Sequence, residues 1–454
     1  MNLQKRLYWI LGVGILGLIG AWQVRHMLPP RHQAAATPAP DPKEIAAKQE
    51  LVRLRNAVIA APTAAQPRWD LIDYYNRYGL SDKAGEQIVA LIQLDPKDKK
   101  ARIALANALL GKNEYLKADE AYRDVVDLDP NSIEALQGLA ATLIKEHRYM
   151  EANSVAQRAL KLNKDDVNTH VLLATSYLEY ALQFPDPTSH ANELNYARIE
   201  LEDLTKALPD KGELFYLLGR ACVGLHAQDG AVHALERAHA LMPDHTDAAR
   251  LLAIAYRAAH NDTAALNLVQ QMIARKPDYA PFYDLWGQIY QDSGASDAPQ
   301  KVLVAYKHAA ELAPNDIFFH ERLGKAYYQA GDLQSARTTF EKVTQLNPNR
   351  SFAFQQLAVI YTRLNQPQLA SEAARIAKQA TFNEQQLTQI QELSKKHPES
   401  VNLHLLLAER YRDLKLPGPA RDEYLNVLRL DPKNSKVPKD LVQVLQASSV
   451  PLPK

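Results

Sequence analysis

The stretch Leu323–Pro348, LGKAYYQAGDLQSARTTFEKVTQLNP, contains the residues that decide the fold. Its small residues include Gly324 and Ala336, and its large ones include Tyr327 and Phe340. Small residues let two helices approach closely, and large residues fill the space beside them. The closing proline ends a helix, because it disfavours the helical conformation of the residue before it. The stretch therefore predicts two helices that pack against each other.

The same pattern returns along the chain, and most steps between equivalent positions are 34 residues, as from Pro314 to Pro348. Three steps, of 45, 37 and 16 residues, depart from this interval and locate irregular segments. The ladder of terminal positions is Pro96, Pro130, Lys164, Pro209, Pro243, Pro277, Pro314, Pro348, Phe382, Pro398 and Pro432, in which Pro398 closes the 16-residue step.

Between the two helices of the opening stretch, Gly331 and Asp332 are suited to a turn. Glycine takes the left-handed conformation without steric cost, so Gly331 is expected just after the end of the first helix. An aspartate side chain can accept hydrogen bonds from the first N–H groups of a helix, so Asp332 is expected to cap the second.

This pattern resembles the tetratricopeptide repeat, a helix–turn–helix unit of 34 residues whose small, Tyr, Ala, Phe and Pro positions follow in this order. We count ten units over roughly residues 65–432, although the third and the ninth end without proline. The resemblance implies an all-α fold, a right-handed α-solenoid in which the first helices of the pairs line a groove. It also implies that the protein binds peptides or proteins and is not an enzyme.

The irregular steps and the composition divide the chain into seven segments. We predict a transmembrane anchor at 1–24, a Pro/Ala-rich linker at 25–42, a capping helix at 43–62, units one to nine at 63–382, an extra helix at 383–398, unit ten at 399–436, and a C-terminal cap and tail at 437–454. Unit four carries an insertion at about 183–193, which includes FPDPTSH, Phe184–His190. It is either a contact loop or an insertion without a role.

The N-terminal segment Leu7–Val24, LYWILGVGILGLIGAWQV, is apolar and carries no charge. As a helix it would be about 27 Å long, close to the thickness of the hydrocarbon core of a bilayer. We expect an uncleaved single-pass anchor in the inner (plasma) membrane of a bacterium, with the repeats in the periplasm. The alternatives are a cleaved signal peptide, whose only small-residue site is the distant Ala34–Ala36, and a cytoplasm-facing adaptor, since both flanks are basic.

Charge and motifs exclude several classes of function. The chain has 53 basic and 52 acidic residues, so no overall field favours nucleic acid. Cys222 is the only cysteine, which leaves no intramolecular disulfide and no cysteine-based zinc site. The HExxH, P-loop, GxSxG and dinucleotide-binding patterns are absent. We therefore expect no catalysis, no cofactor, no metal and no small-molecule substrate.

Histidines between His226 and His260 raise one alternative function, an enzyme accessory subunit or a metallochaperone. His233 and His239 are six residues apart, which places them about 240° apart around a helix, so they cannot hold one metal ion together. Three further histidines fall where the family has a bulky residue in the first helix, and packing explains them: His170, His320 and His404.

Candidate binding residues follow from the groove of the family, which is lined mainly by the second, fifth, ninth and twelfth residues of each unit. In units five and six this register gives Tyr216, Arg220, Arg250 and Arg257. Arginines beside an aromatic ring suit a carboxylate or an acidic peptide, whereas a solvated polar face is the simpler alternative. The next two units supply a secondary groove surface: Gln288, Gln291, Lys325 and Tyr328.

These observations predict a membrane-tethered scaffold that holds a protein or peptide partner, one with an acidic group, in the groove. By resemblance to other anchored repeat proteins, we expect a role in cell-envelope assembly, secretion, pilus or cytochrome c maturation machinery. The carboxylate clamp of chaperone-binding relatives, built from Lys, Asn and Arg on three successive first helices, has no counterpart in this sequence.

Overall fold

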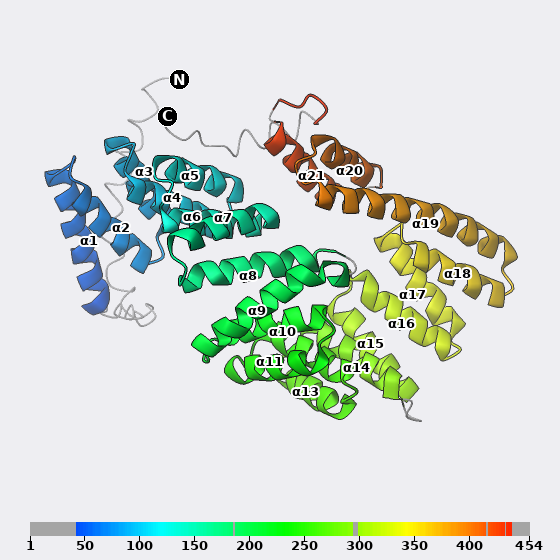
Figure 1. Ribbon diagram of the computed structural model, residues 1–454. Coiled ribbons are helices and arrows are strands. Elements are labelled where there is room, and N and C mark those ends of the chain that lie inside the picture. The colour runs from blue at the N-terminus through cyan, green and yellow to red at the C-terminus, as the bar shows by residue number, and fades with distance from the viewer. Residues whose placement is uncertain (1–41, 185–186, 294–297, 415, 432, 438–454) are drawn as a thin grey trace, which may run out of the picture. The chain divides into compact units, whose positions relative to one another are not determined.

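The computed structural model describes residues 42–184, 187–293, 298–414, 416–431 and 433–437, and these residues form helices without strands (Figure 1). The all-α class predicted from the sequence is confirmed. Within these ranges the helices are α1 (Pro42–Ala60), α2 (Ala65–Arg77), α3 (Ser81–Leu94), α4 (Lys99–Gly111), α5 (Tyr115–Leu128), α6 (Ile133–Lys145), α7 (Tyr149–Leu162), α8 (Val167–Leu182), the short η2 (Pro187–His190), α9 (Ala191–Ala207), α10 (Gly212–Gly224), α11 (Gln228–Leu241), α12 (Thr246–Ala258), α13 (Asp262–Arg275), α14 (Ala280–Ser293), α15 (Ala298–Leu312), α16 (Ile317–Gln329), α17 (Leu333–Leu346), α18 (Ser351–Arg363), α19 (Pro367–Lys396), α20 (Val401–Asp413) and α21 (Pro417–Leu430).

The chain divides into two compact parts, residues 1–87 and 88–454. In the first part α1 packs against α2, and the Tyr74 hydroxyl donates a hydrogen bond to the Ala47 carbonyl at 2.9 Å. In the second part, the helices from α4 to α21 form successive pairs in which each first helix packs against the second helix that follows it. Within the described ranges these are nine pairs, and α2 and α3 precede them in the chain.

Small residues in the first helices receive large side chains of the second helices, as predicted. A Cβ atom added at Gly324 would lie 2.8 Å from the Phe340 ring, and one added at Gly287 would lie 2.5 Å from the Tyr306 ring. Both rings are buried. The buried core continues from unit to unit, and one cluster extends from α8 to α14. Each unit therefore depends on its neighbours to cover its apolar surface.

In seven of the helix pairs that the structure describes, the turn between the two helices has a residue with positive φ at the equivalent position. Gly331 has a φ of 80°, and the Asp332 side chain accepts a hydrogen bond from the Ser335 N–H at 3.0 Å, so both predictions for this turn are confirmed. Besides Gly, Asn and His are among the residues that enter the left-handed region most readily. One of these three residue types occupies the equivalent position in six other units: Gly79, Asn113, His147, His226, His260 and Asn365.

A second recurring contact involves the carbonyl group at the terminal position of a unit. In several units a first-helix side chain lies within hydrogen-bond distance of the carbonyl oxygen six residues earlier, in the loop that precedes the helix. Packing alone therefore does not explain the three first-helix histidines. The pairs are His170 with Lys164 at 2.8 Å, His320 with Pro314 at 3.0 Å, His404 with Pro398 at 3.0 Å, Tyr283 with Pro277 at 3.1 Å and Arg102 with Pro96 at 2.7 Å.

Residues 383–396 do not form the separate helix that we expected. They continue the second helix of unit nine, so α19 runs for 30 residues without a break. Neither proline nor glycine interrupts the chain between Pro367 and Pro398, and Phe382 at the terminal position is compatible with a helix. Glu384, in the extended part, accepts a hydrogen bond from the Ser351 N–H at 3.1 Å and so caps α18.

The predicted localisation, a single-pass inner-membrane protein with periplasmic repeats, is wrong, because no helix within the described ranges is both long and apolar enough to cross a bilayer. The longest of them, α19, carries charged residues along its length, among them Glu372, Arg375 and Lys378. The segments predicted as anchor (1–24) and linker (25–42, except its last residue), and residues 438–454 of the predicted tail, lie outside the described residues.

We expect Ala336→Trp to destabilise unit eight by about 1–3 kcal/mol, because overpacking a close helix contact forces neighbouring side chains out of place. Ala336 is fully buried in a cluster with Phe340 and Val343. Hydrogen exchange of α16, α17 and α18, read by mass spectrometry, measures the change. Lys97→Ala, at an exposed position in a loop, is the control. Unchanged protection in Ala336→Trp would contradict the assigned register.

Candidate binding surface on the first helices

The first helices of successive units lie next to one another. The helix α6 contacts α4 and α8, α10 contacts α8 and α12, and α12 contacts α14. Side chains of α16 and α18 also meet. The exposed sides of these helices therefore form one surface, named here the first-helix face, in the place where the sequence predicts a groove.

In unit five, the structure brings Tyr216 and Arg220 together and gives the arginine a partner within the chain. The Arg220 guanidinium lies 5.9 Å from the centre of the Tyr216 ring. It also donates two hydrogen bonds to Glu179 of α8, at 2.5 and 3.1 Å. Burial opposes the charge of Arg220, but the bonds to Glu179 outweigh it and raise the pKa of the guanidinium. Arg220 is therefore one half of an ion pair.

Both predicted arginines of unit six also have acidic neighbours. Arg250 lies 3.6 Å from Asp247, one turn earlier in α12. Arg257 donates hydrogen bonds to Gln288 at 2.8 Å and to Asp292 at 2.5 Å, both in α14. Carboxylates thus stand beside all three predicted arginines, a feature that the repeat register did not indicate.

Two residues of the predicted secondary groove surface belong to the same polar network. Gln288 accepts the hydrogen bond from Arg257 and donates another to Asp284 at 2.7 Å. Gln291 accepts a hydrogen bond from the Tyr306 hydroxyl at 2.9 Å. The amide groups of both glutamines are therefore held in place from inside the chain.

The other two residues of that surface each join a cation to an aromatic ring. The Lys325 Nζ lies 4.6 Å from the centre of the Phe352 ring, and the Arg363 guanidinium lies 4.6 Å from the centre of the Tyr328 ring. Both contacts run between α16 and α18. They are of a different kind from the ion pairs of units five and six.

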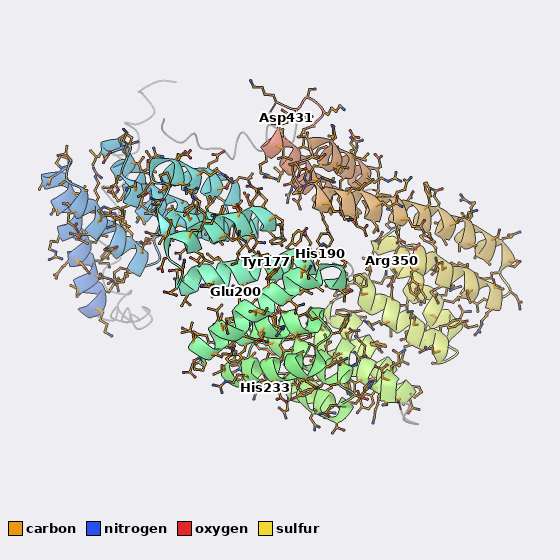
Figure 2. The ribbon with its side chains drawn as sticks, viewed as in Figure 1. Tyr177, His190, Glu200, His233, Arg350 and Asp431 are labelled. Atoms are coloured by element: carbon orange, nitrogen blue, oxygen red, sulfur yellow. The ribbon has the colours of Figure 1, made fainter. Side chains whose placement is uncertain are left out.

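Two ion pairs between neighbouring units escaped the sequence analysis. Arg322 of α16 lies 2.9 Å from Asp284 of α14, and Arg350, labelled in Figure 2, lies 2.7 Å from Glu321 of α16. Burial raises the pKa of Asp284, although Arg322 opposes this shift. Neither arginine occupies one of the four groove positions of the family register. The signal that the sequence offered was a pair of opposite charges about one repeat apart.

The insertion in unit four packs its own aromatic residues together. The Phe184 ring is buried and stacks on the ring of His190, with centres 3.9 Å apart, and Tyr180 meets both rings edge-on. Lys395 of α19 lies 5.7 Å from the centre of the Phe184 ring and donates a hydrogen bond to the Gln183 carbonyl. The insertion therefore makes contacts within the chain, and its predicted role as a contact loop for a partner stays a prediction.

The histidines between His226 and His260, on which the alternative function as a metallochaperone or enzyme subunit depends, do not converge on one point. His226 and His260 occupy turns with positive φ, His233 lies on α11 (Figure 2), and His245 caps α12 through its Nδ1 atom. Burial lowers the pKa of His239. In the part of the chain that the structure describes, no group of three or more His, Cys, Asp or Glu residues could hold a metal ion.

Comparison with known proteins agrees with this architecture. Three models described as tetratricopeptide repeat match the chain, at residues 100–132, 227–289 and 317–350. Anaphase-promoting complex subunit 3 of Schizosaccharomyces pombe is 20% identical over 213 residues, which are 43% of this chain and 32% of that protein. The match thus spans about a third of the length of this relative.

Solved structures of repeat proteins are also similar to this chain. YrrB, described as a TPR protein with an unusual peptide-binding site, is 21% identical, with a TM-score of 0.36 over 44% of this chain and 97% of that one. Yeast Tom70 is 14% identical, with a TM-score of 0.38 over 85% of this chain and 95% of that one.

The regions that match the family models coincide with helix pairs of the structure. Residues 100–132 cover α4 and α5, residues 227–289 extend from α11 into α14, and residues 317–350 cover α16 and α17. These helices carry the small residues, the buried large residues and the positive-φ turns that define the unit. The chain is a tetratricopeptide repeat protein.

Proposed function

We propose that this protein is a non-catalytic interaction scaffold that holds a protein or peptide partner on the first-helix face. Tetratricopeptide repeat proteins act as scaffolds for interactions between proteins, and one observation supports this role for the present chain. Polar bridges join first helices of successive units along that face: Glu179 with Arg220, Arg257 with Asp292, and Asp284 with Arg322.

These bridges favour an extended polypeptide as the ligand. They hold charged groups in fixed positions before a partner arrives, which lowers the cost of ordering side chains on binding. Stacked repeats also present a long surface rather than the deep concave pocket in which small molecules usually bind. The pathways named from the sequence, namely cell-envelope assembly, secretion, pilus and cytochrome c maturation machinery, stay predictions.

The predicted recognition role of Tyr216, Arg220, Arg250 and Arg257 also stays a prediction. An acidic group of a partner would have to share these arginines with carboxylates of the chain, because Glu179, for example, already binds Arg220. We therefore expect the loss of one of these arginines to weaken the binding of an acidic peptide less than the loss of a cation without an acidic partner.

Site-specific photo-crosslinking in the cells from which the protein comes tests the proposed function. A photoreactive amino acid at Gln355 of α18 or Arg250 of α12 should give covalent adducts with a partner protein, since both positions lie on first helices and are exposed or half-buried. The matched control is Lys307, an exposed position on the second helix α15. Adducts formed only from Lys307, or equally from all three positions, would contradict the proposal.

A further inference from the structure

Three cations lie over aromatic rings on and beside α16 and α18. A ring attracts a cation that lies within about 6 Å of its centre, because the face of the ring carries partial negative charge. The pairs, with the distance from the cation to the ring centre, are Lys325 over Phe352 at 4.6 Å, Arg363 over Tyr328 at 4.6 Å, and Arg350 over Phe318 at 5.4 Å.

Two of these cations lack an acidic partner among the described residues. Lys325 and Arg363 are exposed, and each contacts its ring without an ion pair to a described carboxylate. The sequence of α18 contains no acidic residue. The one acid of α16, Glu321, is bonded to Arg350 at 2.7 Å. This part of the first-helix face therefore carries positive charge that the chain itself does not neutralise.

Apolar surface accompanies these cations. Phe318 is 56% exposed and Val359 is 45% exposed. The Phe352 ring is partly buried and packs edge-on against Phe340, with ring centres 6.1 Å apart, so the hydrophobic core supports it. We name the aromatic–cation patch by its residues: Phe318, Lys325, Tyr328, Phe352, Val359 and Arg363.

We propose that the aromatic–cation patch binds an acidic peptide segment of a partner protein, one that also carries an apolar side chain. The proposal rests on the proposed function and specifies the chemistry of the ligand. Carboxylates of the peptide pair with Lys325 and Arg363, and the apolar side chain covers Phe318 or Val359. Hydrogen bonds between charged groups are stronger than those between neutral ones, and cations already placed on rings lose less freedom when they form them.

Charge argues against other occupants of the patch. Residues 1–41 contain four Lys or Arg and one Asp, and residues 438–454 contain two Lys and one Asp, so both ends of the chain are more basic than acidic. A second copy bound about a two-fold axis would place the same positively charged patch against itself. A separate protein with an acidic segment is free of both difficulties.

Fluorescence anisotropy with the full chain and defined peptides tests the proposal. The probes are a labelled peptide Gly-Ser-Glu-Glu-Leu-Glu-Glu-Phe-Gly-Ser and two versions in which Gln or Lys replaces every Glu. We expect only the acidic peptide to bind. In the double variant Lys325→Gln, Arg363→Gln its Kd should rise by about tenfold or more, since two charge-assisted contacts are lost. Phe352→Leu, which keeps both cations, should give a smaller rise.

Two control variants separate this proposal from the proposed function. Lys307→Gln, Lys378→Gln removes the same charge from second helices and should leave the Kd unchanged. The proposal is overturned if the acidic peptide does not bind, if the Gln peptide binds equally well, or if Arg220→Gln, Arg250→Gln weakens binding while the patch variant does not. In that last case the proposed function stands. The proposed function is contradicted by a different result, namely photo-crosslinks that form only from positions on second helices.

Sedimentation of the full chain tests whether a second copy of the chain occupies the aromatic–cation patch. A dimer that dissociates in Lys325→Gln, Arg363→Gln would overturn the proposal, whereas an oligomeric state unchanged by this variant supports a separate partner.

Discussion

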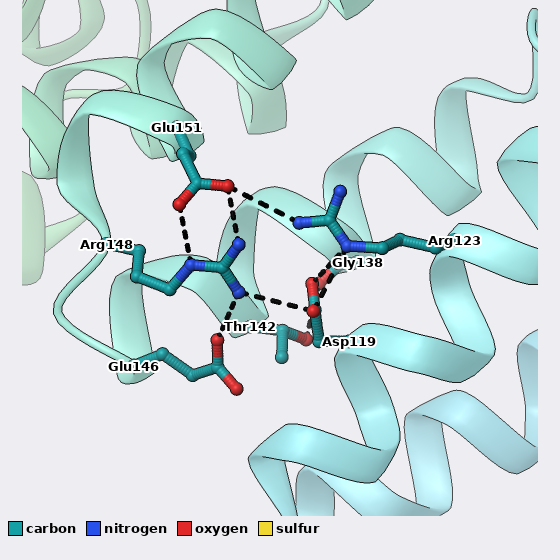
Figure 3. Close-up of polar contacts among 7 residues, drawn as sticks. All are labelled: Asp119, Arg123, Gly138, Thr142, Glu146, Arg148 and Glu151. Carbon is teal, nitrogen blue, oxygen red and sulfur yellow. Dashed lines mark hydrogen bonds and ion pairs between the residues drawn. The ribbon is translucent and has the colours of Figure 1, made fainter. Parts of the chain in front are cut away.

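Replacing Arg148 by Met should destabilise units two and three by about 3–5 kcal/mol, because it leaves buried carboxylates without their cation. The Arg148 side chain is only 10% exposed and contacts three acidic residues, which are the centre of the cluster shown in Figure 3. These partners are Glu146 and Glu151, on either side of it in the sequence, and Asp119 of α5.

The geometry of this cluster explains why one side chain affects two units. Arg148 donates to Glu146 at 2.7 Å and to Glu151 at 2.7 Å, and it reaches across the unit boundary to Asp119 at 3.2 Å. Arg123 of α5 donates to the same Asp119 at 3.0 Å. Burial raises the pKa of Glu146, and the hydrogen bond from Arg148 opposes this rise. Removing the arginine should therefore raise the pKa of Glu146 further.

This pKa shift gives Arg148→Met a characteristic pH dependence. An acid whose pKa is raised in the folded state binds its proton more tightly there, so its contribution to stability is present at low pH and is lost as the pH rises through the folded-state pKa. The deficit of the variant should thus be smaller at about pH 5 than at about pH 7, with the Glu reference pKa near 4.3. Urea denaturation followed by circular dichroism at the two pH values measures it.

Lys206→Met is the control for this experiment, because Lys206 and its partner Asp203 are both exposed. An exposed ion pair is screened by solvent, so its loss should have little effect at either pH. If both variants lose equal stability, the Arg148 cluster does not hold the units together.

The helix pairs could be predicted from the sequence because the same pattern of residues returns many times. A single residue, by contrast, is compatible with several local structures. One Gly–Asp pair indicates a turn only weakly, yet Gly331 and Asp332 lie within a framework of small, large and terminal positions that returns mostly at 34-residue intervals. Each helix pair covers its apolar surface only by stacking on the next. Residues that pack are therefore constrained in every unit, and the structure confirms the turn and the cap that this framework predicted.

The partners of polar residues could not be predicted in the same way, because they depend on how neighbouring units sit together. The distance along the chain from Glu179 to Arg220 is 41 residues, since the insertion in unit four lies between them. Arg322 and Arg350 form their ion pairs from positions outside the groove register. The extended helix α19 escaped prediction for a simpler reason, since Phe382 occupies the terminal position in place of a proline and does not force the helix to end.

Replacing Phe340 by Ala should destabilise the pair α16–α17 by about 3–5 kcal/mol, the cost of removing a buried aromatic side chain and leaving a cavity. Phe340 is fully buried, and its ring lies against Gly324 of the first helix. Hydrogen exchange of α16 and α17 reports the loss locally, which suits an array whose units can open separately. Phe382→Ala, at a position that is 52% exposed, should change protection little.

A double-mutant cycle between Gly324 and Phe340 tests whether the glycine is small because of this ring. In the natural chain, Gly324→Ala places a Cβ atom 2.8 Å from the Phe340 ring, so the steric conflict should outweigh the gain of about 1 kcal/mol in helix propensity. In the Phe340→Ala background the ring is absent, and the same substitution should stabilise the unit. A change of sign between the two backgrounds measures the coupling directly. If Gly324→Ala changes stability equally in both backgrounds, the Phe340 ring is not the reason for a small residue at position 324. The pairing of small and large positions between the helices would then have another cause.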